Sequence, residues 1–402
     1  MEKKIAIIVG ILIAVVIVVG IGAYYATLKP PAPPVAPSVE ITYTGCGPMP
    51  MLLATKEIDG YMAWQPFIAV AEEAKIGKIV SYSQDLPPGI WKDHFCCCLF
   101  VRDDLVDRNP ELVSDLAALL MVANEYVREH PDEAAEIAAD WLVGGGPMKY
   151  GEITVSSVEM EKKSIPTIKF TTEPSESWIN STLLFVDVGR DIGYITERLN
   201  ATGIEETRAL LFNFTPYYEA KEMLERGEII TPPLEERTIG IGYQPSDHHT
   251  QLWVACDKWE YFKEHYGIYL KEIERKKEYE FVVNNESVAR ITLTLTTAGS
   301  DMMTLVSQNT LQIGLVATPA IFTVDKGTPG KIIFPIHTEG SGLVVANDTP
   351  CESGNWTSFI EWVKKRSEEG KTVKIAAPLR GSIQDVQIKY ALKESGIKTV
   401  EV

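Results

Sequence analysis

The stretch Thr238-Ile-Gly-Ile-Gly-Tyr-Gln-Pro-Ser-Asp-His-His-Thr250 leads from an alternating apolar segment into a polar turn and then into a helical pattern. Apolar alternation with a period of two predicts a strand over residues 238–243, and a helix is expected over 247–265. Ser246 stands at the position of a helix N-cap, and the free N–H groups of a first helical turn can bind an anion or a carbonyl oxygen. The stretch therefore predicts a strand–turn–helix unit whose turn faces a small ligand.

Length and charge limit the class of protein. A chain of 402 residues can form two packed lobes, and 45% hydrophobic with 23% charged residues is typical of a globular protein. The net charge of −17 argues against nucleic acid or an anionic membrane surface as a partner. It does not exclude a small anion, because a helix terminus acts locally.

The N-terminal segment predicts a membrane anchor over residues 1–28. Residues 5–28 carry no charge and follow Lys3-Lys4; as a helix they span about 36 Å, enough for one bilayer. The lysines favour a cytoplasmic N-terminus with the remainder outside the membrane, and a cleaved signal peptide is the alternative. Residues 29–37 are a proline-rich spacer.

Six asparagines begin an Asn-x-Ser/Thr triplet, the acceptor pattern for N-glycosylation, which also favours an external location. They are Asn180, Asn200, Asn213, Asn285, Asn347 and Asn355.

From residue 38 onward, short apolar runs alternate with helical patterns, which indicates an α/β fold. We expect a second lobe built from residues 38–100 and 351–402, and a first lobe from 237–350. A crossover and helical segment, ending in a linker over 228–236, is expected across residues 101–236. A long strand is expected over residues 94–102, whose apolar run includes Cys96-Cys97-Cys98.

Six segments of this chain resemble the periplasmic binding proteins of the nitrate/sulfonate/taurine and thiamine-precursor transport family. They are Gly242-Tyr-Gln-Pro-Ser-Asp-His-His249, Ala298-Gly-Ser-Asp-Met-Met303, Gly314-Leu-Val-Ala-Thr-Pro319, His337-Thr-Glu-Gly-Ser-Gly342, Leu379-Arg-Gly-Ser-Ile-Gln384 and Ile58-Asp-Gly-Tyr-Met-Ala-Trp-Gln-Pro66. The resemblance covers nearly all of residues 38–402. It implies a two-lobed periplasmic-binding-protein-like (type II) fold that holds its ligand in the cleft and closes about a hinge.

The order of these segments differs from the order in that family. Residues 378–385 precede residues 48–66 in the family but follow them here. We therefore predict a circularly permuted fold, in which the strand at 39–43 lies beside the strand at 397–402. A fusion of two half-proteins is the alternative.

The resemblance also implies a set of ligand-binding residues at the strand ends. Arg380 is the expected partner of an anionic group, because its guanidinium can hold a carboxylate or sulfonate with two hydrogen bonds. Ser300 and Ser382 have plain helix capping as an alternative role. The predicted ligand-binding residues are Ser246, His248, Ser300, Thr318, Arg380, Ser382, Trp64 and Gln65.

The three adjacent cysteines also resemble a cysteine run in the fungal-type synthases of the thiamine pyrimidine, although a further cysteine of that pattern is missing here. Consecutive strand residues point to opposite faces, so three neighbours in a strand rarely bind one ion. We therefore expect Cys96, Cys97 and Cys98 to be small buried apolar side chains, and we expect no metal site and no cofactor.

Together these features predict the extracytoplasmic substrate-binding protein of an ABC importer, a protein that is not an enzyme. Its partners would be the permease and ATPase subunits, the membrane through the N-terminal helix, and a small anionic or zwitterionic solute. Nitrate, sulfonates, taurine, bicarbonate and pyrimidines are ligands of the family that it resembles. A thiamine-pyrimidine synthase-like enzyme and a membrane-tethered ligand-sensing domain are the alternatives.

Overall fold

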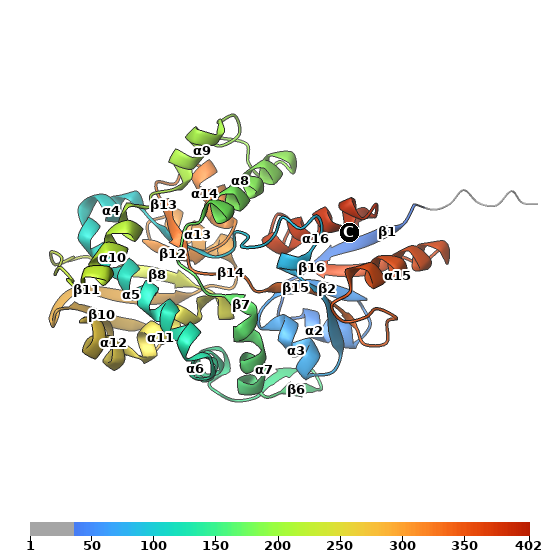
Figure 1. Ribbon diagram of the computed structural model, residues 1–402, viewed down its shortest axis with the longest axis horizontal. Helices are drawn as coiled ribbons and strands as arrows, with labels where there is room; N and C mark the ends of the chain where they lie inside the picture. The colour runs from blue at the N-terminus through green and yellow to red at the C-terminus, as the bar shows by residue number, and fades with distance from the viewer. Residues whose placement is uncertain (1–35) are drawn as a thin grey trace, which may run out of the picture.

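The protein has two lobes, and each is built on its own mixed β-sheet (Figure 1). The structure is a computed structural model that describes residues 36–402. The small-lobe sheet has the strand order β17-β1-β16-β2-β15-β3, and the large-lobe sheet has the order β13-β4-β12-β8-β11-β10-β9. The α/β class and the two lobes are therefore confirmed.

In the small lobe, strands from the two ends of the described chain lie side by side. Strand β1 (Ser38–Tyr43) runs parallel to β16 (Val373–Ala377) on one side and to β17 (Lys398–Glu401) on the other. Figure 1 shows the blue β1 within the same lobe as the red C-terminal elements. The predicted pairing of these two ends is confirmed.

The remaining small-lobe elements match the expected strands and helices closely. They are α2 (Met49–Ala54), β2 (Gly60–Trp64), α3 (Phe67–Glu73), β3 (Gly77–Tyr82), the 3-10 turn η1 (Ser83–Asp85), β15 (Ser341–Ala346), α15 (Trp356–Glu368) and α16 (Ile383–Glu394).

In the large lobe, β12, β8 and β11 form a parallel centre with antiparallel strands on both sides.

Two elements of the large lobe differ from those predicted. The helix predicted over residues 247–265 is divided into η3, α11 and α12, and the sequence did not predict the β9–β10 hairpin. Strand β9 buries only its first three residues, so its charged second half hides the apolar alternation. The elements are β4 (Cys98–Val101), α4 (Asp103–Arg108), β8 (Ile239–Tyr243), η3 (Asp247–His249), α11 (Thr250–Asp257), α12 (Trp259–Tyr266), β9 (Ile268–Glu274), β10 (Glu278–Val283), β11 (Glu286–Leu295), α13 (Gly299–Ser307), β12 (Ile313–Val316), α14 (Pro319–Asp325) and β13 (Lys331–Pro335).

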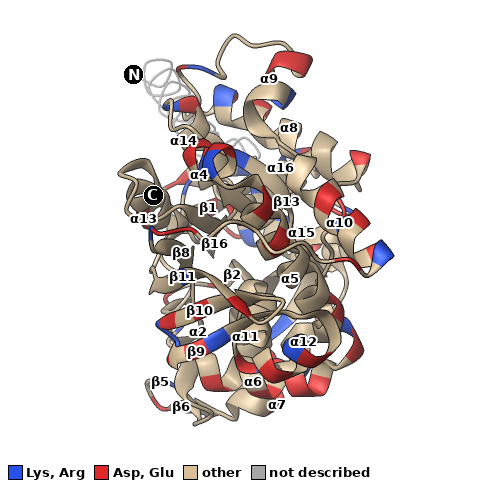
Figure 2. Ribbon diagram, turned by 90° about the vertical axis from the view of Figure 1, so that its left-hand side faces the viewer, with Lys and Arg blue, Asp and Glu red and all other residues tan. Residues whose placement is uncertain are grey.

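A mainly helical segment joins β4 to β8. Its first long helix, α5, buries most of its length in the core, and α6 presents acidic residues (Figure 2). Gly144, at φ 66, ends α6 in the left-handed region, and a short hairpin follows where continued helix was expected. The elements are α5 (Pro110–Glu129), α6 (Pro131–Val143), β5 (Met148–Tyr150), β6 (Ile153–Val155), α7 (Ser157–Ser164), η2 (Ile165–Thr167), β7 (Ile168–Lys169), α8 (Glu176–Asp191), α9 (Ile204–Leu211) and α10 (Thr215–Arg226).

The described chain passes from one sheet to the other through two crossover segments. The first runs from β3 to β4, over residues 83–97, and the second runs from β13 to β15, over residues 336–340, and contains β14 (Thr338–Glu339). The sequence predicts these changes of lobe near residues 100 and 350, which is too late in the chain in both cases. The expected strand over 94–102 is also too long, because residues 94–97 leave the sheet to connect the lobes.

The predicted membrane anchor over residues 1–28, and most of the spacer over 29–37, lie outside the described residues. Within residues 36–402, the longest apolar helices are too short or too polar to cross a bilayer.

Candidate ligand cleft and metal centre

A cavity of about 1100 Å³ lies between the two lobes. Its walls come from the carboxyl ends of strands and from the first turns of the helices that follow, where ligands bind in open α/β sheets. Tyr43, Trp64 and Phe67 line it from the small lobe, and Met303 and Phe322 line it from the large lobe. The walls are therefore mainly apolar and aromatic.

Seven of the eight predicted ligand-binding residues line this cavity: Ser246, His248, Ser300, Thr318, Arg380, Ser382 and Trp64. Their contact with a ligand stays a prediction. Gln65 does not line it. Its side chain is buried and donates from Nε2 to Thr167 Oγ1 at 2.9 Å, and its carbonyl accepts from Ser246 Oγ at 3.1 Å. The contact of its main-chain carbonyl with Ser246 of the large lobe links the two lobes, and its side-chain Oε1 accepts from Ala69 N at 3.1 Å.

The hydroxyl groups of the predicted residues around the cavity differ in their hydrogen bonds. Ser382 Oγ accepts from Asp385 N at 3.3 Å and caps α16, so its capping role is confirmed. Thr318 Oγ1 donates to Gly381 O at 3.2 Å, which links the two lobes across the cleft. Ser300 lies in the first turn of α13, whose N-terminus has no side-chain cap; the capping alternative is wrong for this serine.

The cationic residues at the rim of the cavity already have anionic partners. Arg380 lies 3.2 Å from Glu401, and its guanidinium stacks over the ring of Tyr194 at 5.8 Å from the centroid. Lys326 lies 2.9 Å from Glu197. Among the described residues that line the cavity, both cations are thus engaged, and an anionic ligand would have to compete with a carboxylate for either one.

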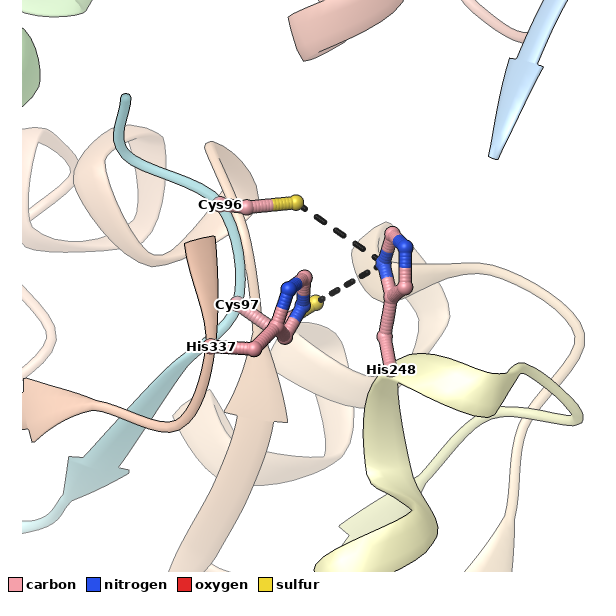
Figure 3. Close-up of side chains that lie close together, drawn as sticks. All are labelled: Cys96, Cys97, His248 and His337. Atoms are coloured by element: carbon pink, nitrogen blue, oxygen red, sulfur yellow. Dashed lines mark hydrogen bonds between the residues drawn. The ribbon is translucent and has the colours of Figure 1, made fainter. Parts of the chain in front are cut away.

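At the floor of the cleft, two cysteines and two histidines come together (Figure 3). One ligand atom from each of Cys96, Cys97, His248 and His337 lies within 4.8 Å of the others, and all four residues are buried. His248 Nδ1 is 3.7 Å from Cys96 Sγ and 3.9 Å from Cys97 Sγ. Cys96 and Cys97 come from the first crossover segment, His337 comes from the second, and His248 comes from η3.

This arrangement corrects the interpretation of the cysteine run. Only Cys98 begins a strand, and its thiol donates to Val316 O at 3.1 Å, away from the cluster. Cys96 and Cys97 precede the strand, so the rule that neighbours point to opposite faces does not apply to them. Sequence reasoning missed His337 as a partner; its position directly after an apolar strand was the available signal.

Burial and the contacts within the cluster shift the pKa values of its side chains. Burial opposes ionisation of Cys96, but the thiol of Cys97 and the imidazoles of His337 and His248 hold the pKa of Cys96 well below its usual range. Burial lowers the pKa of His337 to about 4, and His248 contributes to this shift. For His248 the effect of burial is outweighed by the negative charge of Cys96, and its pKa is raised. The cluster thus stabilises a thiolate beside an imidazole ring.

Two lobes on mixed sheets, with a cavity between them, are consistent with the two-lobed type II binding-protein fold. The pattern of the NMT1-like family matches residues 27–143 and 232–402, which together are more than half of the chain. The chain therefore belongs to the NMT1-like family.

The chain is also similar to an uncharacterised protein of Methanocaldococcus jannaschii. The two are 40% identical over 107 residues, which are 26% of this chain and 74% of that protein. No solved structure matches the chain.

Proposed function

We propose that this protein is the extracytoplasmic substrate-binding subunit of an ABC importer and that it captures a small solute between its lobes. The observation that carries the proposal is the cavity of about 1100 Å³, lined from both lobes, in a chain of the NMT1-like family. Members of this family are mostly binding proteins. The two crossover segments supply the hinge that closure on a solute requires.

The lining favours a flat heteroaromatic solute over a small inorganic anion. Tyr43, Trp64, Phe67 and Phe322 provide aromatic walls, and aromatic rings bind flat rings by stacking and apolar burial. Nitrate or bicarbonate would need charged partners, and Arg380 is already paired at the rim. Within the family's ligand range, a pyrimidine fits these walls best, and a sulfonate with an apolar body is second.

Two buried polar atoms beside the cavity lack a protein partner. They are His249 Nε2 and the indole Nε1 of Trp64, within the described residues. The other ring nitrogen of His249, Nδ1, lies 2.9 Å from Gln244 N and 3.2 Å from Gln244 O, so the backbone of Gln244 holds the ring in place. An indole N–H only donates, so Trp64 would pair with a hydrogen-bond acceptor on a solute that reaches it. The uncapped N-terminus of α13, next to Ser300, can accept one anionic group.

A thermal-shift screen tests the proposal. The full-length protein, purified in detergent, is heated with nitrate, bicarbonate, taurine, longer sulfonates and pyrimidines. A solute at a hundredfold excess over its Kd should stabilise the folded state by about 2.7 kcal/mol. We expect a pyrimidine to give the largest shift. Absence of a shift with every class would contradict the proposal, and chemical conversion of any of these solutes, followed by mass spectrometry, would favour an enzyme over a binding protein.

A pair of tryptophan variants separates cavity binding from general destabilisation. Trp64→Ala should weaken pyrimidine binding by about 1–3 kcal/mol, the usual value for one stacked base. Trp356 packs in α15 outside the cavity lining, and its Nε1 donates to Ser395 Oγ at 3.0 Å. Trp356→Ala should lower stability while the solute affinity stays unchanged. Equal loss of affinity in both variants would remove Trp64 from the site.

We further propose that residues 5–28 anchor the protein, with the lobes outside the cell and the permease and ATPase subunits as partners. The charge-free N-terminal segment supports this location, as do sequons in exposed turns, such as Asn200 and Asn285. Protease treatment of intact cells should digest the lobes. Full protection in intact cells, with digestion after lysis, would contradict it.

We also propose that the chain is a circular permutant. The support is the place of β1 between β16 and β17. Strands β17 and β1 are parallel, so a connection from residue 402 to residue 38 must run back along the strands and needs about a dozen residues or more. A gene with a flexible linker of that length between these residues, and with new ends near residue 228, should encode a protein with the same cooperative unfolding and solute affinity. Loss of both would favour the fusion of two half-proteins.

A further inference from the structure

We infer that Cys96, Cys97, His248 and His337 bind one divalent metal ion of the zinc type at the floor of the cleft. The four residues come from three separate parts of the chain, and their ligand atoms converge within 4.8 Å in a buried site. Two thiolates and two imidazoles in a tetrahedral arrangement are a ligand set that prefers Zn²⁺.

The two distances from His248 to the sulfur atoms fit a tetrahedron. A metal with bonds of about 2.3 Å to sulfur and about 2.05 Å to nitrogen holds these two atoms about 3.6 Å apart at a tetrahedral angle. His248 Nδ1 lies 3.7 Å from Cys96 Sγ and 3.9 Å from Cys97 Sγ. Both distances are close to this edge, and Figure 3 shows both sulfur atoms facing the same ring nitrogen.

The tautomer of His248 is the one that metal binding requires. Its Nε2 lies 3.1 Å from Gly340 O, and because a carbonyl oxygen only accepts, Nε2 carries the proton and donates. In the neutral ring the lone pair is then on Nδ1, which faces the two sulfur atoms. Donation of the second ring N–H to a backbone carbonyl is the usual support of a metal-bound histidine.

His337 has the same arrangement with its two nitrogens exchanged. Its Nδ1 lies 3.4 Å from Thr338 O, to which it can only donate, so the lone pair of the neutral ring is on Nε2. This Nε2 is buried and has no hydrogen-bond partner within the described residues. A buried acceptor without a partner is costly, and a metal ion would satisfy it.

The position of the site suggests what the ion does. Cys96 and Cys97 belong to the first crossover segment, His337 belongs to the second, and His248 belongs to the large lobe. Four protein ligands close the coordination sphere, as in structural zinc sites. One ion would therefore join both crossover segments to the large lobe and fix the hinge from which the small lobe moves. This role is independent of the identity of the solute.

Cobalt is the probe for the test, because Co²⁺ replaces Zn²⁺ and is coloured. The full-length protein is purified in detergent, reduced, freed of metal with a chelator and titrated with Co²⁺. We expect saturation at one equivalent, thiolate-to-cobalt charge-transfer absorption, and the intense visible bands of a tetrahedral ion, all lost when Zn²⁺ is added. A wild-type protein that binds no stoichiometric Co²⁺, or binds it without the thiolate bands, would overturn the inference.

Variants with a matched control locate the ligands. Cys96→Ser should retain about half of the charge-transfer intensity, since one of two thiolates remains, and His337→Gln should weaken Co²⁺ affinity at least about 100-fold. Cys98→Ala is the control, because Cys98 belongs to the same run but bonds to Val316 O. It should bind Co²⁺ like the wild type. If Cys98→Ala lost as much affinity as Cys96→Ser, the assignment would be wrong. No solute is used, so a failed solute screen leaves this result unaffected.

Discussion

The polar groups at the rim of the cleft differ from those at its floor in whether they have partners within the protein. At the rim, Arg380 and Lys326 are paired with carboxylates and partly exposed. At the floor, His337 Nε2 and His249 Nε2 are buried and lack a partner within the described residues. A charged side chain at an exposed rim is easily paired with a neighbouring side chain or solvated by water. A buried polar atom without a hydrogen-bond partner instead marks a place where a ligand or metal ion can bind. Chemical specificity should therefore come from the floor.

The largest expected effect is stabilisation by zinc at the floor. Free Zn²⁺ at a thousandfold excess over its Kd should raise the free energy of unfolding by about 4.1 kcal/mol. A calorimetric scan of the chelated and the zinc-loaded protein measures this difference. The Cys96→Ser/Cys97→Ser double variant should lose it, because both thiolates are gone, whereas Arg380→Gln/Lys326→Gln at the rim should keep it. Equal stabilisation of both double variants would remove the distinction between rim and floor.

A buried carboxyl group without a hydrogen-bond partner also occurs away from the cleft. It allows a test of whether such groups indicate a binding site or only lower the stability of the protein. Asp115 is buried in α5, both of its carboxylate oxygens lack a partner within residues 36–402, and burial raises its pKa to about 8. The folded state therefore holds a proton that the unfolded state releases near pH 4, so the contribution of Asp115 to stability is most favourable below pH 4 and becomes less favourable as the pH rises to about 8.

Asp115→Asn should abolish this pH dependence. We expect the variant to be more stable than the wild type by about 2–4 kcal/mol at pH 9 and nearly equal to it at pH 4. Urea unfolding at both pH values measures the difference. Metal and solute affinity should not change. A wild-type stability that rises between pH 5 and pH 8 relative to the variant would contradict the assigned cause.

A substitution at Gly340, whose backbone lies next to the His248 ring, should have a smaller effect on stability. Gly340 has φ 79, and a Cβ atom there would lie 2.8 Å from His248 Nε2. Gly340→Ala should therefore cost about 1–3 kcal/mol of stability and also reduce Co²⁺ affinity, because it displaces the ring. Gly354, at φ 68 with open space around it, is the control. Gly354→Ala should cost about 1 kcal/mol without any change in Co²⁺ affinity.

The smallest effect is expected at the rim. Arg380→Gln breaks an ion pair whose members are both partly exposed, so it should change stability by less than about 1 kcal/mol, and by still less at high salt. Its effect on pyrimidine affinity should be smaller than that of Trp64→Ala, as titration calorimetry can measure. A larger loss in Arg380→Gln would move recognition from the aromatic walls to the rim.

Much of the fold was predictable from local patterns. The strand at residues 238–243 and the capping of α16 by Ser382 were confirmed, because alternation and cap chemistry are local signals. The pairing of the two ends was also confirmed, but it was predicted from the order of the segments that resemble the family. The β9–β10 hairpin was missed because its exposed edge carries charged residues. The strand through the cysteines was predicted too long, because an apolar run does not show where a chain leaves a sheet.

The sequence by itself determined the α/β class, the family and seven of the residues that line the cavity, since these depend on periodicity and short motifs. Only the tertiary structure decided that Arg380 is paired with Glu401, that the carbonyl of Gln65 links the lobes and that Cys96 and Cys97 meet His248 and His337. Convergence of residues far apart in the chain depends on how two crossover segments pass between the sheets. No local sequence pattern predicts the course of these segments, because the residues that meet there are far apart along the chain.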